Sequence, residues 1–148
     1  MSNDTPSPDH QPPPGPDPLT VEAVGLLTEA LESTERARGH LYSFHQLTGK
    51  ADFGLGDAID KLRAAGHVEL AERLQTELLG RNVLPGMWTF QIMETYDATY
   101  WMPFRELEKD VRDALLQGRR HVHEAALKES RRTHGHADHT ARPTTDEC

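Results

Sequence analysis

Four polar side chains able to exchange protons or bind ligands fall on or beside the apolar faces of the expected helices: Arg38, His45, Asp97 and His121. A buried charge without a partner is costly, so each group needs a counter-charge, a water molecule or an exposed edge. Arg38 with Asp97, or His45 with Asp97, are the natural pairs. Either pair would serve as a buried contact that fixes the register of two helices.

A pocket between helices is the functional alternative for the same residues. Ligand sites in proteins combine an apolar wall with a few converging polar groups, and Tyr96 and Tyr100 neighbour Asp97 on the last expected helix. The candidate ligand-binding set is therefore Asp97, His45, Arg38, Tyr96 and Tyr100.

Metal binding is the sharper form of that hypothesis. Helical carboxylate bundles that hold two metals use paired Glu-x-x-His motifs, which this chain lacks, and its His40 and His45 are five residues apart and so point to different faces. A site for one divalent metal built from His45, Asp97 and His121 stays open as the alternative to a chain without a cofactor.

Other reactive residues give little support for catalysis. The serines on the expected helices lack a nucleophile-elbow glycine pattern, and Cys148 ends a polar tail where no base could be held against it. The histidines near the end, His134, His136 and His139, would bind metal only adventitiously. We expect no catalytic residue and favour a protein that is not an enzyme.

An aromatic stripe must position Asp97. Seven residues keep helical phase for about five turns: Ile92, Met93, Tyr96, Tyr100, Phe104, Leu107 and Val111. The phase predicts one continuous packing face, with Asp97 on its flank. Trp88, Phe90 and Trp101 lie beside this face, where large aromatic side chains are typical interface anchors.

The helix that would face this stripe begins near Thr20 and is expected to run to about Leu47, ended by Gly49. At 100° per residue its apolar face consists of Ala23, Leu27, Ala30, Leu31, Ala37 and Leu41. Two shorter helical pieces should follow, one over 58–65 and one ending at Gly80, with a break at Gly66 and His67.

The last helix is expected to run from Trp88 to about Arg132, kinked near Thr99 by Pro103 and fraying after Gly118. No segment alternates as a strand would. The sequence therefore predicts an all-α antiparallel bundle, with long first and last helices and two shorter helical pieces between them.

Both ends of the chain are polar. Residues 1–18 are rich in proline and residues 133–148 contain a histidine cluster, and neither segment has the apolar side chains that offset ordering entropy. We predict disordered tails at 1–18 and 133–148, around one helical domain at 19–132.

Charge and composition exclude several classes. A net charge of −8 over 148 residues argues against a nucleic-acid partner, because phosphate neutralisation needs clustered lysine and arginine. A single cysteine provides no internal disulfide. No apolar run approaches the roughly 18 residues of a membrane span, and the start lacks the pattern of a signal peptide. We expect a cytoplasmic protein with no membrane partner.

The stretches 39–49 and 86–97, together with the preference for arginine over lysine, resemble a family of small uncharacterised helical proteins from actinobacteria. The resemblance covers most of residues 19–135 and implies no activity. From the residues themselves we expect a non-enzymatic module that binds another protein or itself. The alternative is a ligand-binding or metal-binding bundle, possibly an enzyme, with its pocket around Asp97.

Overall fold

The computed structural model describes residues 4–144 and confirms an all-α chain. Its elements are a short 3-10 helix η1 (Pro8–His10), α1 (Pro18–Ala64), α2 (Val68–Glu77), α3 (Thr89–Tyr96), a π-helical turn η2 (Asp97–Trp101), α4 (Met102–Leu116) and α5 (Val122–Arg131). No strand is present in that range, where the nearest feature is an isolated bridge between Leu84 and Met87. No helix within it combines the length and apolar character needed to cross a bilayer.

The chain forms two compact units. Unit 1 comprises residues up to Ser33 together with those from Phe104 onward, and unit 2 comprises Thr34–Pro103. Helix α1 contributes residues to both units. Each unit is described by itself below.

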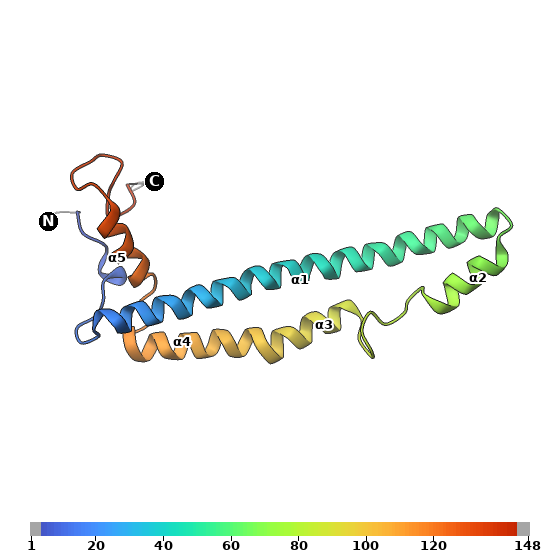
Figure 1. Cartoon of the computed structure of the whole chain (residues 1–148), viewed down its shortest axis with the longest axis horizontal. Helices are drawn as coiled ribbons and strands as arrows, with labels where there is room; N and C mark the ends of the chain where they lie inside the picture. Colours follow the sequence, from blue (N-terminus) through green and yellow to red (C-terminus); the bar gives the residue numbers. More distant parts are fainter. Residues whose placement is uncertain (1–3, 145–148) are drawn as a thin grey trace. The chain divides into compact units, whose positions relative to one another are not determined.

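Helix α1 is longer than the sequence predicts: it is 47 residues long and continues through Gly49 to Ala64 (Figure 1). The expected stop at Gly49 is wrong because a glycine inside a helix costs only about 1 kcal/mol relative to alanine, which packing can offset. The helix ends at Gly66, as predicted. Gly66 has φ +87°, and the His67 and Gly66 amides donate to the Leu62 and Arg63 carbonyls, a Schellman motif.

The expected apolar face of α1 is corrected in part. Ala23, Ala30 and Ala37 are exposed, whereas Leu27, Leu31 and Leu41 are partly buried. One row of protected positions recurs every seven residues: Val24, Leu31, Arg38, His45, Asp52 and Ile59. A seven-residue period is that of a coiled-coil seam, so α1 packs along one narrow line instead of a broad apolar face.

The predicted last helix is interrupted twice. At Asp97–Trp101 it takes a π-helical turn, close to the kink expected near Thr99. The cause is Pro103, which has no N–H to donate to Thr99, so the Met102 amide donates to the carbonyl of Asp97 instead.

The π turn holds one more residue than an α turn and shifts the phase of everything after it by one position. Tyr100 is 52% exposed and Leu107 is 64% exposed, so these two do not belong to the continuous packing face that the sequence predicts. Trp101 and Glu108 take the inward positions in their place, and Glu108 is only 4% exposed.

The helix then ends at Leu116 instead of continuing to Arg132. Gln117 and Gly118 both have positive φ, of 54° and 73°, and these left-handed residues turn the chain away from the helix axis. Helix α5 is a separate element that starts after His121, itself left-handed at φ 57°.

Unit 1 has an apolar cluster formed by Val21, Val24, Leu116 and Val122, with Val111 packed against it. Beside it, Glu108 accepts hydrogen bonds from Thr28 at 2.9 Å and from Arg112 at 3.0 Å. The charge of this buried carboxylate is therefore compensated.

Within unit 1, two arginines bind residues near the start of the chain. Arg132 donates to the Asp4 carboxylate at 2.6 Å and to Glu129 at 2.7 Å, and Arg119 donates to the Gln11 carbonyl at 2.9 Å. A disorder prediction based on apolar composition does not take such ion pairs and hydrogen bonds into account. The predicted disorder of 1–18 and 133–148 stays a prediction, and residues 1–3 and 145–148, including Cys148, lie outside the described residues.

Candidate functional site

Three polar residues on the α1 seam lie in unit 2, spaced seven residues apart: Arg38, His45 and Asp52. Each has a partner in the chain that packs against it. The partners are Asp97, Thr89 and the amide of Gly80, which follow one another in reverse order along the chain. Within unit 2 the facing segments therefore run antiparallel to α1.

Arg38 and Asp97 form a two-pronged ion pair, one of the two pairs that the sequence predicts. The Nε and terminal nitrogen of Arg38 lie 2.7 and 2.9 Å from the two carboxylate oxygens of Asp97. These hydrogen bonds lower the pKa of Asp97 below its usual value and raise that of Arg38. Because Arg38 occupies both oxygens, the pair fits a contact that holds α1 against η2.

Aromatic rings enclose the Arg38 guanidinium. It lies 4.0 Å from the ring centre of Trp101 and 4.9 Å from that of Tyr42, both within cation–π range. The Trp101 indole also donates to Glu35 at 3.0 Å. Trp101, named from the sequence as an interface anchor, is thus engaged within unit 2.

His45 is not paired with Asp97. Its Nδ1 lies 2.7 Å from the Thr89 hydroxyl, and Thr89 is buried at the start of α3. Tyr96 and Tyr100 contact each other, with ring centres 5.8 Å apart. The structure therefore brings together Arg38 and Asp97 from the candidate ligand set but gives His45 a different partner.

The end of α1 and helix α2 form a helical hairpin, defined here as residues 48–81. Arg63 contacts Glu72 at 3.2 Å, and the Gly80 amide donates to Asp52 at 2.9 Å. Ile59 and Ala71 are its buried side chains. These few contacts leave most of the apolar surface of the hairpin uncovered.

Two open grooves adjoin on this hairpin. The first, of about 480 Å³, is lined mainly by apolar side chains that include Leu55, Val83 and Trp88. The second, of about 470 Å³, includes Leu62, Leu70 and Leu74. Leu78 and Arg81 line both grooves, so the two hollows share an edge.

Two leucines that line these grooves are strongly exposed, Leu70 at 56% and Leu78 at 49%. Elsewhere on the hairpin, Phe53 is 81% exposed. Trp88 lines the first groove and Phe90 is half exposed, whereas Trp101 is engaged by Arg38. Of the three interface anchors named from the sequence, one therefore lines an open apolar groove.

Charge on the hairpin is nearly balanced. Six acidic and five basic side chains give residues 48–81 a net charge of −1, although the whole chain carries −8. Like-charge repulsion between two copies of this segment would therefore be small.

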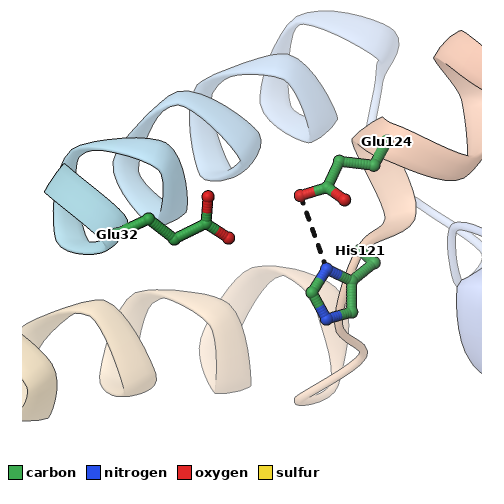
Figure 2. Close-up of side chains that lie close together, drawn as sticks. All are labelled: Glu32, His121 and Glu124. Atoms are coloured by element: carbon green, nitrogen blue, oxygen red, sulfur yellow. Dashed lines mark ion pairs between the residues drawn. The ribbon is translucent and has the colours of Figure 1, made fainter. Parts of the chain in front are cut away.

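The metal set expected from the sequence is not assembled. His45 is paired with Thr89 and Asp97 with Arg38, while His121 lies in unit 1 beside Glu124, with 3.4 Å between Nδ1 and Oε1. Among the described residues, the group with metal-ligand spacing is Glu32, His121 and Glu124 (Figure 2).

Sequence reasoning missed Asp52, Glu32 and Glu124. A seven-residue count from Arg38 through His45 reaches Asp52, so the heptad period was the available signal. The spacing of His121 and Glu124, three apart at a helix start, was visible as well. Nothing local marks Glu32, because its place beside them depends on the turn at residues 117–121.

No protein-family model, curated protein or solved structure matches the chain. The resemblance to small helical actinobacterial proteins therefore stays a prediction.

Proposed function

We propose that this chain is a self-association module, and that residues 48–81 dock against the same surface of a second copy. The observation that carries the proposal is the pair of adjoining apolar grooves, whose lining includes the exposed side chains of Leu70 and Leu78. Exposed apolar surface of this kind is costly in water and marks interaction sites.

A second copy is the occupant favoured by charge. The two grooves carry Asp52, Glu77, Arg73 and Arg81 along with their apolar lining, so a two-fold arrangement can place acids of one copy against bases of the other. The net charge of −1 on this segment permits such an approach. A basic or acidic partner would instead match a surface of one sign.

Pairing two hairpins would also complete the helical packing. Each helix of a lone hairpin has a single neighbour, whereas two hairpins together place four helices around a shared core. The antiparallel bundle predicted from the sequence would then be assembled from two chains.

Light scattering coupled to size exclusion tests the proposal. We expect the full chain to be dimeric at about 100 µM, and Leu78→Asp to weaken the dimer at least about 100-fold, since a charge would enter the shared edge of both grooves. Leu19→Asp is the matched control, because Leu19 is a 72% exposed leucine in unit 1.

Two outcomes would refute self-association through this surface. One is a monomeric wild-type chain at about 100 µM, a concentration at which even a weak micromolar dimer is populated. The other is equal loss of the dimer in Leu19→Asp and Leu78→Asp, which would place the contact elsewhere.

A further inference from the structure

A cluster of three side chains that can bind a metal lies in unit 1, whereas the hairpin and the Arg38–Asp97 pair belong to unit 2. Glu32 comes from α1, His121 from the residue before α5, and Glu124 from the first turn of α5. One ligand atom of each lies within 4.8 Å of those of the other two, and the side chains point toward a common space (Figure 2). Segments almost ninety residues apart in sequence thus converge.

The two carboxylates of this cluster have no direct lysine or arginine partner among the described residues. Within residues 4–144, neither Glu32 nor Glu124 forms an ion pair with a lysine or arginine, and the neighbour of Glu124 is the His121 imidazole at 3.4 Å. Two carboxylates held near each other repel, and a cation between them relieves that repulsion. The His121 imidazole adds a nitrogen ligand, which distinguishes the group from a patch of acids.

We propose that Glu32, His121 and Glu124 bind one divalent transition-metal ion. One nitrogen and two carboxylate oxygens suit a borderline ion such as Zn²⁺. Tetrahedral Zn²⁺ needs ligand atoms about 3.3 Å apart, so the group, whose ligand atoms lie within 4.8 Å of one another, must contract by at most about 1.5 Å. All three side chains are exposed and free to make that movement.

A small cavity of about 20 Å³ borders the cluster and is lined by His121 and Glu124. It can hold a single water, which would supply a fourth ligand. Arg112 and Arg119 also line it, but their guanidinium groups donate to the Gly118 carbonyl and to the Pro8 and Gln11 carbonyls. Both guanidinium groups are therefore engaged by backbone carbonyls, and neither forms an ion pair with Glu124.

Zinc titration by calorimetry tests the site on the full chain. The background carries His134→Gln, His136→Gln and His139→Gln, which removes binding by the C-terminal histidines. In that background we expect one Zn²⁺ per chain. Glu32→Gln and Glu124→Gln should each lower the affinity at least about tenfold, with far-UV circular dichroism unchanged.

Glu29→Gln is the matched control, an exposed glutamate one turn earlier on α1, and it should leave Zn²⁺ affinity unchanged. Substituting Co²⁺ should give visible absorption of a low-coordinate site that Glu32→Gln abolishes. Loss of all binding in the background without His134, His136 and His139 would overturn the proposal, and so would equal affinities for Glu29→Gln and Glu32→Gln.

Discussion

The two units of this chain differ in the side chains that they bury and in how their polar groups are hydrogen-bonded. Unit 1 encloses an apolar cluster of four buried residues and compensates its buried Glu108 with Thr28 and Arg112. Unit 2 lines its seam with Arg38, His45 and Asp52 and satisfies each by a hydrogen bond. Of the large apolar side chains that are exposed within residues 4–144, eleven lie in unit 2 and five in unit 1.

That contrast separates two roles for polar contacts. In unit 1 they accompany a core that the chain closes by itself. In unit 2 they fix the register of α1, while apolar side chains stay exposed on the outside. The alignment of these helices therefore does not depend on burying that apolar surface. Unit 1 should therefore respond to changes in its interior, and unit 2 to changes on its exterior.

The largest effect is expected where unit 1 buries a charge. Glu108→Ala would leave Arg112 without its carboxylate and should cost about 3–4 kcal/mol of unfolding free energy, measured by urea denaturation. Asp113→Ala is the matched control, since Lys109 and Asp113 have the same spacing on the same helix but are 65% and 45% exposed. That variant should unfold like the wild type. Equal losses in both would show that unit 1 has no enclosed interior.

Glycines provide a second comparison. A Cβ on Gly25 in unit 1 would lie 2.5 Å from the Cβ of His123, whereas one on Gly39 in unit 2 meets no atom within 4 Å. Gly25→Ala should destabilise the protein by about 2 kcal/mol through overpacking. Gly39→Ala should stabilise it by about 0.5–1 kcal/mol through better helix propensity. Thermal unfolding of both variants measures the difference, and a stabilised Gly25→Ala would contradict the close packing of unit 1.

The Arg38–Asp97 pair gives the smallest expected loss, because both side chains keep about a quarter of their exposure. Asp97→Ala should cost about 1–2 kcal/mol near neutral pH. The folded state lowers the pKa of Asp97, so the pair contributes fully above the unfolded value of about 3.9 and is lost as pH falls through the lower, folded value. The difference from wild type in urea unfolding should therefore vanish in acid. Asp60→Ala, on the exposed side of α1, should show no such pH dependence.

Much of the secondary structure was readable from the sequence. Helical periodicity predicts an all-α chain. Gly66 predicts the break after α1, and Pro103 predicts the irregularity near Thr99. The pairing of Arg38 with Asp97 followed from the cost of burying either charge alone. These features depend on local chemistry or on a strong penalty.

The remaining features depend on competition between small contributions to the folding free energy. Gly49 does not stop α1, because packing along a long seam outweighs about 1 kcal/mol of propensity. The inward position of Glu108 depends on whether Pro103 bends the helix or adds a residue to one turn, which periodicity alone does not distinguish. The left-handed turn at Gln117 is a further example, since glutamine seldom adopts it.

Helix α1 carries five glycines, at positions 25, 39, 49, 54 and 56, and four of these fall in unit 2. Each lowers the cost of opening the backbone nearby, so amide hydrogens in this part of α1 should exchange with solvent through local opening more readily than those of unit 1. Docking of a second chain would suppress such openings by mass action. If a second chain docks there, the persistence of this long helix would depend on protein concentration as well as on sequence.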